Sequence, residues 1–280
     1  MTDKNPDPSH IRLAKRVADQ LNCSRSTAEQ FIEGGFVSVD GQVVEAPGAR
    51  VRPDQAVTVD PDASLLELTP VTLLLHKPAG FEAGLGQSAP GGGGGGGGAH
   101  GTPSGSHGSH GSHGSRSQGA TPATTLLGAA SHLAEDASGI RVLQRHFRHL
   151  ECFTPLPTEA SGLVVYTQDK RIGRKLAEDI ESLEQECIVE VKGEIAPNGL
   201  QRLCHGLTFN GRPLPPIKVS WQNETKLRFA LKGIRPGQIP AMCEAVGLSV
   251  VAIKRIRIGR VPLAKVPEGQ WRYLQPWEKF

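Results

Sequence analysis

The sequence predicts an α+β protein in which a small module of helices and hairpins precedes a larger, strand-rich domain. Apolar residues recur at helical spacing near the N-terminus, whereas later segments alternate or run as short β-branched stretches. A Gly/Ser/His-rich stretch at about residues 84–123 interrupts the larger domain. With 280 residues, 38% of them hydrophobic and 21% charged, the chain has the composition of a globular protein with a substantial core.

The first module is predicted to contain two helices and a hairpin. The stretch IRLAKRVADQLN spaces its apolar residues along one face of a helix, with basic residues between them. Ser24 suits the N-cap of a second helix, which is expected to end at Gly34-Gly35. In the FVSV stretch, Val37 and Val39 alternate as a strand, and Asp40-Gly41 predicts a tight hairpin turn. A further short strand is expected in VRPDQAVTVD.

The larger domain alternates strands with short helices. It begins with an apolar strand over residues 71–75, and SGLVVYT predicts a central strand that follows a small-residue turn. The stretch KRIGRKLAEDIESLEQE predicts an amphipathic helix, and strands are expected in CIVEVKGEI, KVSWQN and KLRFALKG. Near the end, VVAIKRIRIGRV alternates Ile256 and Ile258 with Arg255 and Arg257, which predicts a half-buried strand with a basic face.

The low-complexity stretch at about residues 84–123 is expected to be a flexible insertion. Gly, Ser and Pro cannot bury enough apolar area to offset the entropy of ordering the backbone. Within it, His107, His110 and His113 repeat every three residues, with His100 upstream. Such a tract can bind nickel, copper or zinc weakly, and the alternative is a linker with incidental histidines.

Composition also bounds the compartment and the partners. The five cysteines form no CxxC pair, which disfavours a zinc site or a disulfide framework and favours a cytoplasmic protein. No apolar run approaches the roughly 20 residues that span a bilayer, and the N-terminus lacks an apolar signal core. Residues 1–62 hold seven Lys/Arg against ten Asp/Glu, and the remainder holds 24 against 18. The basic remainder is compatible with a phosphate-rich partner.

Residues of the first module occur in the order and spacing of a known fold over about 50 residues. They are Arg12-Leu13, Leu21, Ser24-Arg25, Ala28, Ile32, Gly35, Val37, Val39 and Gly41-Gln42-Val43. The module resembles the αL RNA-binding module named after the fourth protein of the small ribosomal subunit. In that family, basic residues of the first helix and a Ser-Arg pair at the second helix start face RNA phosphates. The resemblance implies RNA contacts at Arg12, Lys15, Arg16, Ser24 and Arg25.

The larger domain carries Lys77-Pro78-x-Gly80 after its first strand and IKRIRIGRVPLAKVPEGQWRYL near its end. Together with the preceding module, these motifs resemble the bacterial ribosomal pseudouridine synthases of the branch that carries an N-terminal αL module. The resemblance implies an RNA-binding domain at 1–62, a linker at 63–70 and a domain with a mixed or antiparallel sheet at 71–280. It also implies that active relatives isomerise uridine in ribosomal RNA without a metal or cofactor.

The catalytic loop departs from that family. Active relatives carry Gly-Arg-Leu-Asp-x-x-[Ser/Thr]-x-Gly-Leu. Counting back from Gly162-Leu163 places Thr154, Pro155, Leu156 and Pro157 at the Gly-Arg-Leu-Asp positions. Pro157 therefore stands where the resemblance places the nucleophilic aspartate. Proline has neither a nucleophile nor a titratable group.

Two further positions depart in the same direction. Cys187 stands where relatives have a tyrosine that stacks near the target base, and the segment 236–242 reads PGQIPAM in place of Asn-Arg-Gln-Ile-Arg-Arg-Met. We therefore expect an RNA-binding protein with no catalytic residue. Glu159 lies two residues further along the loop, and it leaves open the alternative of a working synthase with a non-standard carboxylate.

The expected partner is structured RNA, namely ribosomal RNA, with a role in ribosome assembly. Further RNA contacts are expected at Lys77 and on the basic strand at Lys254, Arg255 and Arg257. We expect no membrane partner, no metal and no small-molecule cofactor, and we expect a monomer.

Overall fold

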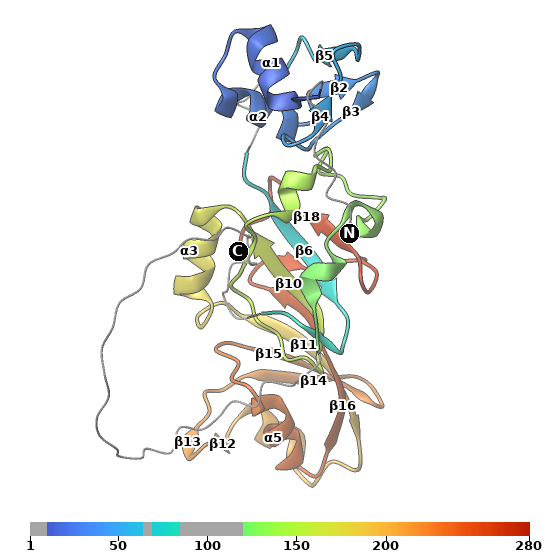
Figure 1. Ribbon diagram of the computed structural model, residues 1–280. Coiled ribbons are helices and arrows are strands. Elements are labelled where there is room, and N and C mark those ends of the chain that lie inside the picture. The colour runs from blue at the N-terminus through green and yellow to red at the C-terminus, as the bar shows by residue number, and fades with distance from the viewer. Residues whose placement is uncertain (1–9, 64–68, 85–119) are drawn as a thin grey trace, which may run out of the picture.

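The computed structural model describes residues 10–63, 69–84 and 120–280. A small module occupies one end of an elongated molecule, and the larger domain is built around one long sheet (Figure 1). This mixture of helices and strands confirms the predicted α+β class.

The small module folds as its sequence pattern predicts. Its elements are β1 (Ile11–Arg12), α1 (Leu13–Leu21), α2 (Arg25–Glu33), β2 (Val37–Val39), β3 (Gln42–Val43), β4 (Arg50–Val51) and β5 (Val57–Val59). Ser24 Oγ accepts a hydrogen bond from the Thr27 N–H at 3.1 Å, which confirms the N-cap. Asp40 and Gly41 have φ angles of 50° and 80°, the left-handed pair that a tight hairpin turn requires. The helices and strands share one apolar core, in which Ile32 is fully buried.

Nine strands form the sheet of the larger domain, in the order β14-β15-β11-β16-β10-β6-β18, with β17 on β16 and β9 on β10. They are β6 (Thr72–Lys77), β9 (Glu151–Cys152), β10 (Ser161–Thr167), β11 (Gln185–Lys192), β14 (Lys218–Asn223), β15 (Lys226–Leu231), β16 (Ser249–Ile258), β17 (Val261–Pro262) and β18 (Trp271–Tyr273). Only β10 and β16 pair in parallel within this sheet, so the expected mixed sheet is confirmed.

Helices and two short strand pairs surround the sheet. The α-helices are α3 (Lys170–Asp179), α4 (Gly199–Cys204) and α5 (Gln238–Glu244). The 3-10 helices are η2 (Ala123–Leu126), η3 (Ala129–Ser131) and η4 (Gln144–Phe147). Two short pairs lie outside the sheet, β7 (Phe81–Glu82) with β8 (Thr121–Pro122) and β12 (Thr208–Phe209) with β13 (Arg212–Pro213).

The sheet has two halves, each with its own core. Strands β6, β10 and β18 pack against the segment that contains the 3-10 helices η2 and η4. Strands β11 and β15 pack against α5. The halves meet where β10 pairs with β16 over only two positions, Ser161 with Lys254 and Gly162 with Arg255. The loop of residues 154–160, which contains the candidate site, leads into β10 at this junction. The junction therefore positions the site.

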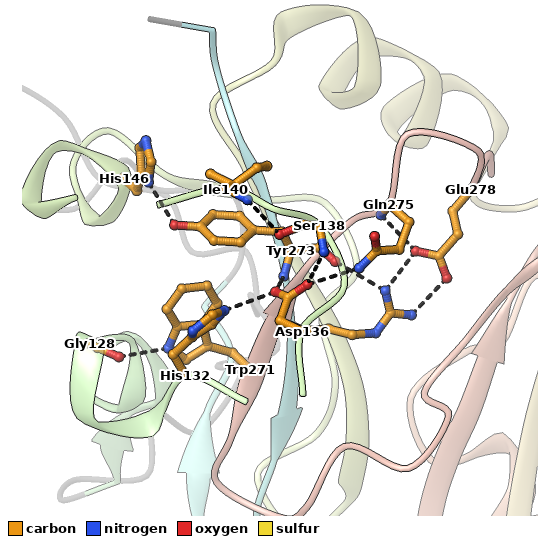
Figure 2. Close-up of polar contacts among 11 residues, drawn as sticks. Gly128, His132, Asp136, Ser138, Ile140, His146, Trp271, Tyr273, Gln275 and Glu278 are labelled. Atoms are coloured by element: carbon orange, nitrogen blue, oxygen red, sulfur yellow. Dashed lines mark hydrogen bonds and ion pairs between the residues drawn. The ribbon is translucent and has the colours of Figure 1, made fainter. Parts of the chain in front are cut away.

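Asp136, which lies between the 3-10 helices η3 and η4, joins this segment to strand β18 through hydrogen bonds (Figure 2). Its side chain is 1% exposed. Its carboxylate accepts hydrogen bonds from the backbone N–H groups of Tyr273 and Ser138, both at 2.8 Å, and from Gln275 Nε2 at 2.9 Å. His132 Nε2 lies 2.9 Å from the same carboxylate. Burial alone would raise the pKa of Asp136, but these hydrogen bonds outweigh burial and lower it.

Replacing Asp136 by asparagine is expected to lower the free energy of unfolding by about 2–4 kcal/mol at neutral pH. An amide NH₂ would face a donor in either orientation, because both carboxylate oxygens accept hydrogen bonds. The folded pKa lies below that of the unfolded chain, so this stabilisation is present above about pH 4 and is lost as the pH falls through the folded pKa. Urea unfolding from pH 7 to pH 3 measures it. The exposed Asp19→Asn is the control, and an equal, pH-independent loss in both variants would contradict this account.

Several predictions fall on residues outside the described ranges or at their borders. The His100, His107, His110 and His113 tract lies outside them, as do residues 85–119 of the expected insertion. Residues 121–123, at the end of the expected insertion, lie in β8 and at the start of η2. Among the described residues, no helix is long and apolar enough to cross a membrane. No group of three or more His, Cys, Asp or Glu in the described ranges could hold a metal ion.

Candidate functional site

The loop before β10 occupies the position that the sequence assigns to catalysis. Thr154 and Leu156 are buried at 0% and 9% exposure, whereas Pro155, Pro157 and Glu159 are exposed. The side chain at the expected aspartate position is therefore a proline ring at the surface. The side chains that turn inward from this loop include a hydroxyl and an aliphatic group, and neither is a carboxylate.

Arg255 of β16 fixes this loop from within the protein. Its guanidinium donates hydrogen bonds to the carbonyl oxygens of Thr154 (2.6 Å), Pro155 (3.1 Å) and Leu163 (2.9 Å), and to Gln185 Oε1 (3.1 Å). All four acceptors are neutral, and no ion pair is formed by Arg255 within the described parts of the chain. Burial lowers the pKa of this guanidinium to about 10, so it stays charged at neutral pH.

The sequence predicts that Arg255 contacts RNA, but the side chain is buried. A β-bulge explains why. Glu186 of β11 pairs with Arg257 and Cys187 pairs with Arg255, which leaves Ile256 as an extra residue on β16. An extra residue breaks the strict alternation of side chains between the two faces of a strand. Arg255 therefore points into the protein, where it is 4% exposed, and cannot contact RNA phosphates in this structure.

Lys77, another predicted RNA contact, is also buried, with 0% exposure at the end of β6. Its Nζ donates hydrogen bonds to the carbonyl oxygens of Pro78 (2.9 Å), Phe81 (2.8 Å) and Thr158 (3.3 Å). Burial lowers its pKa to about 8, and the charge of Glu159 acts in the opposite direction. Lys77 thus ties the turn after β6 to the loop before β10, and its ammonium group does not reach the surface.

The other departures from the expected active site lie in the second half of the sheet. Cys187 is 2% exposed, and burial raises the pKa of its thiol to about 11, so it is not a nucleophile at neutral pH. Gly237 at the start of α5, and Pro240 and Ala241 within α5, supply no cation. The side chain of Gln238 is buried and accepts a hydrogen bond from the backbone N–H of residue 235 at 3.1 Å.

The predicted RNA face of the small module lies at the surface. Arg12, Lys15, Ser24 and Arg25 are exposed, and Arg16 is half-buried. Within the described parts of the chain, these five residues form one ion pair, between Arg25 Nε and Glu29 Oε1 at 3.1 Å. The arginine side chain in this pair is 58% exposed. Exposed pairs of this kind are weak, so a phosphate can displace the glutamate.

The basic face of β16 is less available than its sequence predicts. Lys254 is half-buried, whereas Arg257 pairs with Glu184 at 2.5 Å and with Glu186 at 2.7 Å. The hydrogen bond from Arg257 to Glu186 is the main reason that the pKa of this guanidinium is raised. Any phosphate at Arg257 would compete with two carboxylates.

Sequence reasoning missed the two groups that hold the loop, because it placed both Arg255 and Lys77 at the surface. The alternation of isoleucine and arginine in β16 gave no signal of the bulge. Lys77 precedes a proline and a glycine turn, which indicates a tight turn but not that the lysine closes it.

Comparisons with known proteins identify one matching domain family and several similar proteins. The S4 domain family matches residues 11–57. An uncharacterized RNA pseudouridine synthase of Aquifex aeolicus (strain VF5) is 24% identical over 267 residues, which cover 94% of this chain and 92% of that protein. Ribosomal small subunit pseudouridine synthase A of Escherichia coli (strain K12) is 23% identical over 94% of this chain and 96% of its own length. A crystal structure of a pseudouridylate synthase is 17% identical, with a TM-score of 0.49, over 95% of this chain and 96% of that chain.

Proposed function

We propose that this chain, which belongs to the RNA pseudouridine synthases with an N-terminal S4 domain, binds RNA without isomerising uridine. One observation supports the loss of turnover most directly. Pro157 stands where the family motif leads us to expect the catalytic aspartate, and it lies at the surface of the loop before β10.

The chemistry of isomerisation explains why turnover needs a carboxylate at that position. The glycosidic bond of the flipped nucleotide must break and the base must rejoin through carbon, with a carboxylate acting at the nucleoside. Pro157 supplies no such group, and Cys187 is a buried neutral thiol where relatives have a tyrosine. Loss of a nucleophile commonly costs several powers of ten in rate.

The arrangement of Arg255 supports the same conclusion. A buried cation next to an active-site loop would favour a carboxylate in that loop. Here the guanidinium is matched by three backbone carbonyls and one amide oxygen. The fold of the loop is therefore satisfied without an acidic residue, and Thr154 adds to it by accepting a hydrogen bond from the Val165 N–H at 2.9 Å.

A second candidate is a working synthase that uses Glu159. The observation in its favour is that this carboxylate is close enough to Lys77 to act on its pKa. However, Glu159 is exposed and lies two residues beyond the family position. A displacement of about 1 Å in a catalytic group already costs about a hundredfold in rate. We therefore favour binding without turnover.

The exposed cations of the S4 domain support RNA as the partner. The domain presents Arg12, Lys15 and Arg25 at the surface, and Arg25 is the first residue of the capped helix α2. The name of the Escherichia coli relative refers to the small ribosomal subunit, and we propose ribosomal RNA as the class that this chain binds.

Replacing Arg12, Arg16 and Arg25 together by alanine (the S4 variant) is expected to weaken RNA binding and to reduce the logarithmic salt slope by about two units. The reason is that each phosphate contact that is lost releases roughly one counterion fewer. Fluorescence anisotropy with fragmented ribosomal RNA over a salt series measures it. A matched control replaces Lys192, Arg212 and Lys218, which are exposed on the larger domain. An S4 variant that binds like the unmodified protein would show that the S4 domain is not the anchor.

A further inference from the structure

We propose that helix α3 carries a second phosphate-binding surface, which contacts the same RNA that the S4 domain holds. This surface, the α3 face, consists of Lys170, Arg171, Arg174 and Lys175, and all four residues are exposed. The inference rests on the proposed RNA binding and extends it to a helix of the larger domain that follows β10 and carries none of the catalytic-motif residues.

The packing of α3 forces these four cations outward. The opposite face of the helix contributes Ile172, Leu176 and Ile180 to the core beside β10. A Cβ added at Gly173 would lie 2.7 Å from the ring of Phe153, so the helix is seated closely on that ring. Because this contact leaves α3 little freedom to rotate, the four basic side chains remain on the solvent side.

Helix stability does not account for the position of these charges. A helix favours acidic residues in its first turn and basic residues in its last, because of its macrodipole. In α3 the first turn holds Lys170 and Arg171, the helix has no acidic residue in its first turn, and the last turn has no basic residue. Asp169 caps the start from outside the helix by accepting a hydrogen bond from the Arg171 N–H at 2.8 Å. Lys170 and Arg171 therefore stand where they oppose the helix dipole, which favours a role in binding.

These cations are weakly paired within the protein. Arg171 lies 3.6 Å from Asp169 with 91% of its side chain exposed, and Lys175 pairs with Asp179 at 3.0 Å with 49% exposed. In the described ranges, neither Lys170 nor Arg174 forms an ion pair. Exposed pairs contribute little, so phosphates can displace them at small cost.

One residue of the α3 face, Lys170, borders a cavity that the S4 domain also lines. Lys170 shares this cavity of about 570 Å³ with Gln30 and Glu33 of α2 and with Arg148 and His149. Arg148 Nη1 pairs with Glu33 Oε1 at 3.1 Å across the boundary between the two domains. Figure 1 places α3 on the larger domain below α2. An RNA strand that leaves the S4 helices on this side therefore meets α3 next.

The test compares the S4 variant and two further variants of the full chain in the same salt series. A fluorescein-labelled RNA hairpin is the probe. The α3 variant carries Lys170→Gln, Arg174→Gln and Lys175→Gln, and the control carries Lys192→Gln, Arg212→Gln and Lys218→Gln. Both lose three exposed charges. The α3 variant is expected to bind about tenfold more weakly and to lose about two units of salt slope, while the control keeps most of the slope. Circular dichroism confirms that each variant is folded.

The outcomes separate this inference from the proposed function. If the S4 variant loses affinity while the α3 variant binds like the unmodified protein, the α3 face is not an RNA surface and the proposed function stands. Equal losses of RNA affinity in the α3 and control variants would show that net charge alone causes the loss. That result would overturn the inference. If the unmodified protein does not bind RNA, both proposals fail. Loss of binding to phosphatidylserine vesicles, with RNA binding unchanged, would identify a membrane contact instead.

Discussion

Replacing Gly162 by alanine is expected to lower the free energy of unfolding by about 3–6 kcal/mol, through backbone strain and overpacking together. Gly162 has a φ of 119°, which L side chains rarely adopt. An added Cβ would lie 2.2 Å from the carbonyl oxygen and 2.5 Å from the nitrogen of Arg255. Both atoms belong to the backbone of β16, so neither can move without separating the two halves of the sheet.

The buried Trp271 makes intrinsic fluorescence a suitable probe of this unfolding in urea. A loss of this size shifts the melting temperature by roughly 10–20 °C in a domain of this size, and it can prevent soluble expression. Gly128→Ala is the control, because a Cβ there would meet no atom within 4 Å. A Gly162→Ala variant as stable as this control would show that β10 and β16 do not approach closely.

Replacing Arg255 by alanine is expected to cost about 3–5 kcal/mol of the free energy of unfolding. The change leaves the carbonyl oxygens of Thr154, Pro155 and Leu163 without their donor in a buried site. Lysine at this position keeps the charge but lacks the planar fork that reaches several acceptors at once, so Arg255→Lys should be intermediate. Equilibrium urea unfolding of the three proteins measures the order.

The neighbouring Lys254→Ala is the matched control for Arg255. Lys254 is half-buried on the same strand, and the protein forms no ion pair with it in the described ranges, so its loss should cost less than about 1 kcal/mol. Hydrogen exchange at the Val165 N–H, which donates to Thr154, reports on the loop itself. If Arg255→Ala were as stable as Lys254→Ala, the guanidinium would not be the group that holds the loop.

Much of the fold could be predicted because local signals and tertiary packing agree. Ser24 both begins the α2 pattern and caps it, and Asp40-Gly41 both punctuates two strands and adopts the required left-handed angles. The stretch KVSWQN coincides with β14 at both ends, and SGLVVYT coincides with β10. In each case neighbouring residues alone specify the structure.

The arrangement around the site could not be predicted from such local signals. Arg255 is buried because a bulge at Ile256 changes which side chains of β16 point inward, and that bulge depends on pairing with β11, about 70 residues earlier in the chain. Asp136 likewise accepts a hydrogen bond from the Tyr273 N–H of β18, 137 residues further along. The sequence pattern predicts α3 only as an amphipathic helix and does not indicate where its basic residues lie relative to the S4 domain. Of these basic residues, Lys170 lies at the cavity that α2 of the S4 domain also lines.

The most direct test of binding without turnover is a single-turnover assay with ribosomal RNA that carries tritium at carbon 5 of uridine. Isomerisation joins that carbon to the ribose and releases the tritium into water, so release counts product directly. The account predicts that the unmodified protein binds this RNA and releases no tritium above the level without protein, while an active relative releases it under the same conditions. Tritium release that depends on the unmodified protein and disappears in Glu159→Gln would contradict the account and establish Glu159 as the working carboxylate.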